Sequence, residues 1–168
     1  LLYSASPAER EVGMLLLYSL HEVICDYVSI DNIIEVLRSG ITDSDGAVRS
    51  MAVKAACDVI TSFIEEDEIT KFSCLIPLLL QSLQQCIQQY DVELMLRIFG
   101  LFEDAAMDSS RFLGPHAMDI VVLCCNALGD DKLMYNIRVC AGACLMELMC
   151  YCYVMKEIQV PALRWSDD

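Results

Sequence analysis

Hydrophobic residues recur along this chain at helical spacing, and no sustained run alternates apolar and polar positions at a period of two. The pattern predicts seven helices, at about residues 7–26, 32–40, 47–66, 70–89, 92–107, 115–128 and 133–155. Ser6 followed by Pro7 is typical of a helix start. Pro77 falls inside the fourth predicted helix, where a proline removes a backbone hydrogen bond, so we expect a kink or break there.

A short motif returns on three of these helices: an arginine followed three residues later by glycine or alanine. The copies begin at Arg10, Arg49 and Arg138, and a degenerate copy without the arginine begins at Glu93. The spacings between them are 39, 44 and 45 residues. A drifting period of this size is typical of two-helix HEAT-type repeats.

The helices and the period together predict an all-α fold, a HEAT-repeat α-solenoid of about three and a half repeats with seven antiparallel helices in two layers. We expect residues 1–168 to form one such segment, cut from a longer chain. The expected divisions are a partial repeat at 1–27, repeats at 31–66, 69–108 and 112–155, and a tail at 156–168.

Composition excludes several classes of function. The 168 residues carry a formal net charge of −14, which argues against nonspecific nucleic-acid binding and mildly favours basic partners. No apolar run approaches the ~20 residues that a membrane span needs. The ten cysteines lie mostly within apolar helical sequence, so we interpret them as reduced, buried side chains of a cytosolic or nuclear protein.

No residue set indicates catalysis or metal binding. The two histidines are His21 and His116, and the sequence has neither a glycine-rich phosphate loop nor a nucleophile elbow. His21 and Cys25 lie one helical turn apart, as two metal ligands could, but no further ligand is near in sequence. We therefore expect a protein that is not an enzyme and that binds neither a cofactor nor a metal.

The three arginines of the motif are interpreted as structural. A buried guanidinium needs compensation, so we expect a ladder in which Arg49 pairs with Asp43 or Asp45, and Arg138 with Asp130 or Asp131, while Arg10 begins the series. The alternative is that these arginines contact a ligand.

Three stretches resemble HEAT repeats of the importin β (karyopherin β) superfamily. They are residues 6–20, residues 92–115 with Leu101-Phe102-Glu103-Asp104 inside, and Asn136-Ile137-Arg138-Val139-Cys140-Ala141-Gly142. Within that superfamily the chain is most similar to the importins that carry histones and ribosomal proteins. The resemblance implies a nuclear transport receptor of cytoplasm, nucleus and nuclear pore. It also implies that the helices at 7–26, 47–66, 92–107 and 133–155 line the inner surface.

The partners that the resemblance implies are basic protein cargo, Ran through the full-length receptor, and Phe-Gly nucleoporins. Carboxylates on the inner helices are the expected cargo contacts: Glu22, Asp26, Asp58, Glu65, Glu103, Asp104 and Glu147. The alternative is that these are only the solvated faces of amphipathic helices. Phe72, Leu75, Leu79, Phe112 and Leu113 are either core residues, which we favour, or an outer groove for Phe-Gly repeats.

A second function remains open, a HEAT-repeat scaffold for assembling a protein complex, because the same fold serves both. The irregular repeat spacing fits importins better than the near-constant repeats of phosphatase scaffolds. An armadillo-type adaptor is rejected, because such proteins line their groove with repeated Trp and Asn, and this chain has one Trp.

Overall fold

The computed structural model describes residues 1–64, 67–108 and 110–155, and every regular element in these ranges is helical. The seven long helices are α1 (Pro7–Tyr27), α2 (Ile30–Ile41), α3 (Gly46–Ser62), α4 (Ile76–Gln89), α5 (Val92–Asp108), α7 (Ala117–Gly129) and α8 (Tyr135–Met155). Shorter pieces connect them: the 3₁₀ helices η1 (Asp67–Leu75) and η2 (Gly114–His116), and the single-turn α6 (Ser110–Leu113). The predicted all-α fold with seven helices is confirmed.

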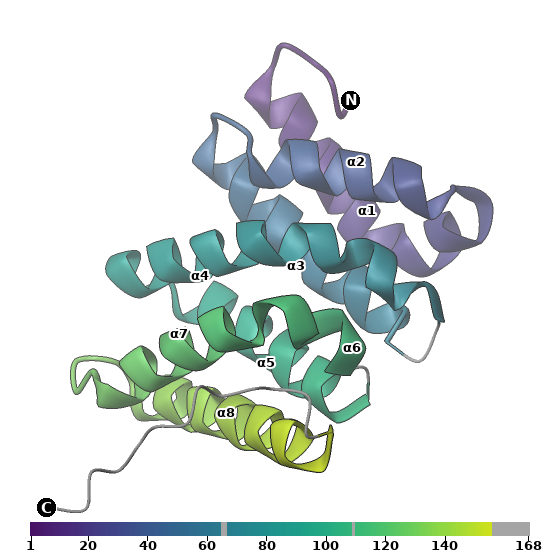
Figure 1. Ribbon diagram of the computed structural model, residues 1–168. Helices are drawn as coiled ribbons and strands as arrows, with labels where there is room; N and C mark the ends of the chain where they lie inside the picture. The colour runs from purple at the N-terminus through teal and green to yellow at the C-terminus, as the bar shows by residue number, and fades with distance from the viewer. Residues whose placement is uncertain (65–66, 109, 156–168) are drawn as a thin grey trace, which may run out of the picture.

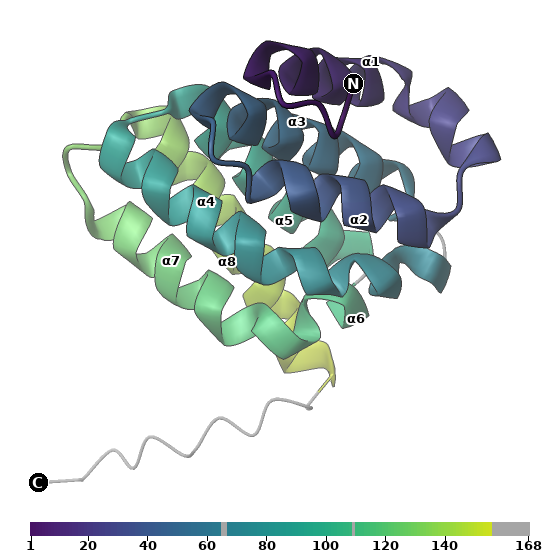
Figure 2. The ribbon, with the colours of Figure 1, turned by 90° about the horizontal axis from the view of Figure 1, so that it is seen from above.

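The helices form two layers (Figures 1 and 2). Helix α1 packs on α3, α3 on α5 and α5 on α8, which makes a four-helix layer. Helices α2, α4 and α7 form a three-helix layer, in which each contacts the next and each packs on its partner in the other layer. The four helices expected to share the inner surface are therefore the members of one layer.

The core runs the length of the stack between the layers. Its largest fully buried side chains include Phe72, Phe99, Phe102 and Phe112, which come from α5 and from the connecting pieces η1 and α6. Phe112 and its neighbour Leu113 are 0 % exposed, as are Phe72, Leu75 and Leu79. These five side chains, for which both a core and an outer-groove position were considered, are therefore core residues and line no outer groove.

Several boundaries differ from the predicted ones, and prolines explain two of them. Pro77 lies in the first turn of α4 and not inside a longer helix, because the preceding residues 67–75 form η1 instead. A proline is well placed there, since first-turn N–H groups have no partner within the helix. Pro115 likewise lies in η2, so α7 starts at Ala117. Helix α3 ends at Ser62, short of the expected Glu66, which lies outside the described residues.

The starts of the four-helix layer define a common register. Arg10, Arg49, Met95 and Arg138 each donate a backbone hydrogen bond of 3.1–3.2 Å to the residue just before the helix, which is Ser6, Asp45, Asp91 or Met134. The fourth copy of the motif therefore centres on Met95, and the expectation that Glu93 replaces the arginine is wrong. Met95 is 1 % exposed, so an apolar side chain fills the arginine's place.

Candidate functional site

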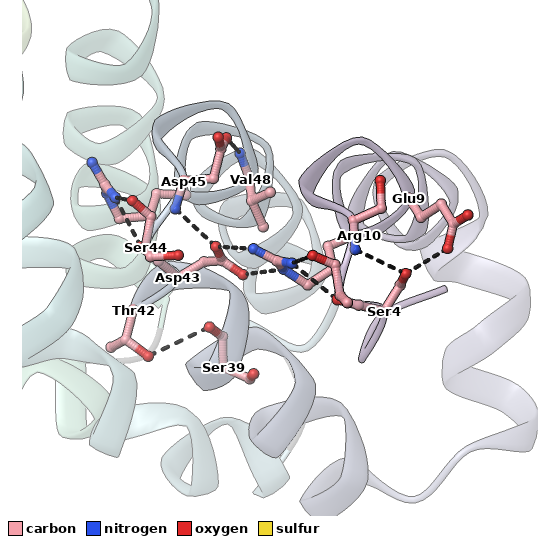
Figure 3. A network of polar contacts seen from close by, with 12 residues as sticks. Ser4, Glu9, Arg10, Ser39, Thr42, Asp43, Ser44, Asp45 and Val48 are labelled. Atoms are coloured by element: carbon pink, nitrogen blue, oxygen red, sulfur yellow. Dashed lines mark hydrogen bonds and ion pairs between the residues drawn. The ribbon is translucent and has the colours of Figure 1, made fainter.

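The first motif arginine joins two repeats (Figure 3). Arg10 of α1 donates two hydrogen bonds to the carboxylate of Asp43, in the α2–α3 turn, from Nε at 2.7 Å and from Nη2 at 2.8 Å. Its Nη1 donates to the carbonyls of Ser4 and Ala5. Both charged side chains are mostly buried, 15 % and 11 % exposed. The hydrogen bond from Arg10 lowers the pKa of Asp43 to about 2. This bidentate pair fixes α1 to the turn of the following repeat.

The second arginine has different partners from those expected. Arg49 donates through Nη1 to the carbonyls of Asp43 at 2.8 Å and Ser44 at 2.9 Å. The expected pairing with a carboxylate of Asp43 or Asp45 is wrong. The Asp43 carboxylate is held by Arg10, and that of Asp45 caps α3 by accepting from the N–H groups of Ala47 and Val48.

The third arginine has no ion pair in the described part of the chain. The expected partners were Asp130 and Asp131, but Asp130 accepts from the backbone N–H of Lys132 instead. The Nε atom of Arg138 is buried and makes no hydrogen bond there. Because Nε is the atom that Arg10 uses toward Asp43, the ladder is complete only at its first step.

The common register also orders the candidate carboxylates. Counted from the residue just before each helix, the thirteenth position holds a carboxylate in three helices: Asp58 in α3, Asp104 in α5 and Glu147 in α8. We call these three residues the carboxylate row. All three side chains are half-buried, and in α1 the same place holds Ser19. Neighbouring helices of one layer therefore bring three of the predicted carboxylates to the same level.

The members of the carboxylate row differ in whether a basic side chain pairs with them. Asp58 accepts a 2.8 Å hydrogen bond from Arg97 of α5, so its charge is already paired. Asp104 and Glu147 have no basic partner among the described residues. Burial, with Asp108 nearby, raises the pKa of Asp104 above its usual value. Within the described residues, two of the three carboxylates thus lack a paired basic side chain.

The other predicted carboxylates lie around this row. Glu103 is half-buried beside Asp104, and Glu22 and Asp26 are exposed in the last turns of α1. None of the three is ion-paired within the described part of the chain. Glu65 lies outside the described residues.

The sequence did not predict the polar network that joins α1, α3 and α5 of the four-helix layer. Arg97 of α5 donates to the hydroxyl of Tyr18 in α1 at 2.9 Å and stacks over its ring at 5.2 Å, as well as pairing with Asp58 of α3. Lys54 of α3 pairs with Glu93 at 2.7 Å, which lowers the pKa of Glu93. Only the packing of three helices brings Tyr18 and Arg97 together, so no local pattern could indicate the contact.

The described cysteines range from buried to exposed, and a hydrogen bond with Cys144 lowers the pKa of Cys124. Those in the described residues are free thiols. Burial raises the pKa of Cys57 to about 12 and that of Cys86 to about 11, so both stay protonated at neutral pH. His21 shares a 2.9 Å hydrogen bond with the backbone carbonyl of Tyr18. Within the described ranges, no three His, Cys, Asp or Glu residues are grouped as metal ligands would be, and no helix has the length and apolarity to span a membrane.

Comparison with known proteins identifies the repeat type. A family model described as "IPO5-like, TPR repeats" matches residues 1–123. No curated protein sequence matches the chain.

Among solved structures, the chain is similar to karyopherin Kap121p, with 21 % sequence identity. The complex of Kap121p with the SUMO protease Ulp1p gives a TM-score of 0.68, and those with Ste12p and with Nup53p give 0.69. Each comparison covers 90 % of this chain and 15 % of the Kap121p chain. The chain thus has the fold of a karyopherin solenoid segment and spans a small part of the length of Kap121p.

Proposed function

We propose that this chain, which belongs to the family of IPO5-like TPR repeats, is a segment of a nuclear transport receptor that binds basic protein cargo. The observation that carries the proposal is the family match over residues 1–123, together with a stack of helices that follows the karyopherin solenoid over 90 % of the chain. The receptor would move between cytoplasm and nucleus through the nuclear pore, and would meet Ran through its full length.

The cargo surface that we propose is the face of the four-helix layer that carries Asp104 and Glu147, with Glu103 beside them. These carboxylates have no basic partner in the described part of the chain, whereas Asp58 is paired with Arg97. An exposed ion pair contributes only ~0.2–1 kcal/mol, so affinity would come from several contacts along an extended basic segment. Glu22 and Asp26 of α1 would extend the surface toward the N-terminal repeat.

The test is binding of a basic peptide, such as a histone tail, to the parent chain and to two charge-reversed variants. Asp104→Lys/Glu147→Lys changes the proposed surface, and Glu35→Lys/Asp119→Lys changes the net charge equally with two exposed carboxylates of the three-helix layer. We expect the first variant to weaken binding at least tenfold at low salt and the second to weaken it far less. Equal losses would show that only net charge matters, and binding that is insensitive to salt would contradict the proposal.

A groove on the three-helix layer offers a place for the nucleoporin partner. Between α4 and α7 it has a volume of about 390 Å³ and is lined by apolar side chains with a polar edge: Pro77, Leu80, Gln81, Gln84, Asp119, Val122 and Leu123. The five side chains first considered for Phe-Gly binding are buried in the core, so we assign that binding to this groove instead. Val122→Asp should abolish any binding of a Phe-Gly peptide, while Glu35→Lys on α2 should leave it unchanged.

A further inference from the structure

A small cleft with a mixed polar and apolar lining lies where α3, α4 and α5 meet. Its volume is about 120 Å³, and Arg49, Ser82, Gln85, Gln89 and Asp91 are among the residues that line it. None of these belongs to the carboxylate row or to the apolar groove, so the cleft is separate from the surfaces proposed above.

Arg49 enters this cleft in a setting that repeats the setting of Arg10. In both cases Nη1 donates to the backbone carbonyls five and six residues earlier, Ala5 and Ser4 for Arg10, Ser44 and Asp43 for Arg49. Arg10 uses its remaining donors, Nε and Nη2, to hold the carboxylate of Asp43. The Nε and Nη2 of Arg49 have no partner among the described residues.

The lengths of the turns explain why Arg49 lacks a carboxylate. Four residues separate α2 from α3, and Asp43 lies two residues before the cap residue Asp45. Only Tyr90 and Asp91 separate α4 from α5, and the same count back from Asp91 reaches Gln89, the last residue of α4. Gln89 is neutral and exposed, and makes no hydrogen bond to Arg49. The second turn thus leaves a cleft where the first turn supplies an acid.

We propose that this cleft binds the carboxylate of an acidic side chain from a bound protein, with Arg49 holding it as Arg10 holds Asp43. The hydroxyl of Ser82 and the amide of Gln85 line the same space and can donate further hydrogen bonds. Asp91 is the one acidic group in the lining; its Oδ1 accepts from the backbone N–H of Leu94, and it forms no ion pair with Arg49. A bidentate guanidinium–carboxylate pair supplies direction as well as charge.

The experiment follows the side-chain Nε–H resonance of Arg49 by NMR in the ¹⁵N-labelled chain. The probes are a blocked Gly-Glu-Gly peptide and its Gly-Gln-Gly counterpart. We expect a saturable shift with the glutamate peptide and none with the glutamine peptide. The resonance of Arg38, an exposed arginine of α2, serves as the internal control. Equal shifts of Arg49 and Arg38, or no shift at Arg49, would overturn the proposal.

Two further measurements sharpen the result. Gln89→Glu places a carboxylate from the chain itself beside Arg49, so it should weaken peptide binding at least tenfold without altering the fold. Undiminished binding in this variant would contradict the proposal. A peptide with a blocked amino end and a free terminal carboxyl group tests the other source of this chemistry; tighter binding of that peptide would overturn the assignment to a side chain. All probes here are acidic or neutral, so the result is independent of the test with basic cargo.

Discussion

The junction of α1 and α2 with α3 and the junction of α3 and α4 with α5 carry an arginine at the same helical position. At the first junction Arg10 closes a bidentate pair with Asp43, and Gly40 of α2 lies against Met14 and Ala52. At the second, Arg49 reaches only the carbonyls of its own preceding turn and borders an open cleft. The repeated motif therefore fixes the position of the arginine on its helix, while the length and residues of the next turn decide what the arginine binds.

The largest difference should come from the close approach at the first junction. A Cβ atom at Gly40 would lie 2.7 Å from the Cβ of Ala52 and would collide with the methyl carbon of Met14. Gly40→Val should therefore lower the free energy of unfolding by about 3 kcal/mol, measured by urea denaturation. Gly100→Val in α5 is the control, since a Cβ there meets nothing within 4 Å, and it should change stability by less than about 0.5 kcal/mol. Similar losses in both variants would remove the claim of tight packing.

Removal of the carboxylate at the first junction should have the next largest effect. Asp43→Ala leaves the mostly buried guanidinium of Arg10 without its acceptor, and we expect a loss on the order of 2 kcal/mol in chemical denaturation. Gln89→Ala, at the corresponding place of the second junction, should cost less than about 0.5 kcal/mol, because Gln89 makes no hydrogen bond to Arg49 that could be lost. Equal losses would mean that the two junctions do not differ in this way.

The same pair predicts a dependence on pH. The pKa of Asp43 is about 2 in the folded chain, below its ordinary value, so the unfolded state binds more protons between these two pKa values. The stabilisation is complete above pH ~5 and is lost as the pH falls toward 2. The difference in unfolding free energy between the parent and Asp43→Ala should therefore shrink steadily from pH 5 to pH 2. A constant difference over this range would assign the stabilisation to packing and not to charge.

The contrast also shows what the sequence could and could not predict. Helical spacing predicted seven helices and the recurring motif predicted their stacking, since both depend on patterns within one or two turns. The partner of Arg10 was not predicted, because Asp43 is 33 residues away and also stands six residues before Arg49. The frame at Glu93 was misplaced by two residues because Met95 replaces the arginine that marked the other copies. The carboxylate row became visible only when the helix starts gave a common register.

The smallest effect is expected at Arg49 itself. Arg49→Met removes hydrogen bonds to the carbonyls of Asp43 and Ser44, and the exposed carbonyl of Ser44 can accept from water instead. We expect the free energy of unfolding to fall by less than about 1 kcal/mol, read as a small decrease in Tm. In a double-mutant cycle this loss should be additive with that of Gln89→Ala. A loss as large as that of Asp43→Ala, or strong coupling to Gln89, would mean that the second junction is closed in solution. The cleft would then be no place for an outside carboxylate, because Arg49 would already be engaged within the chain.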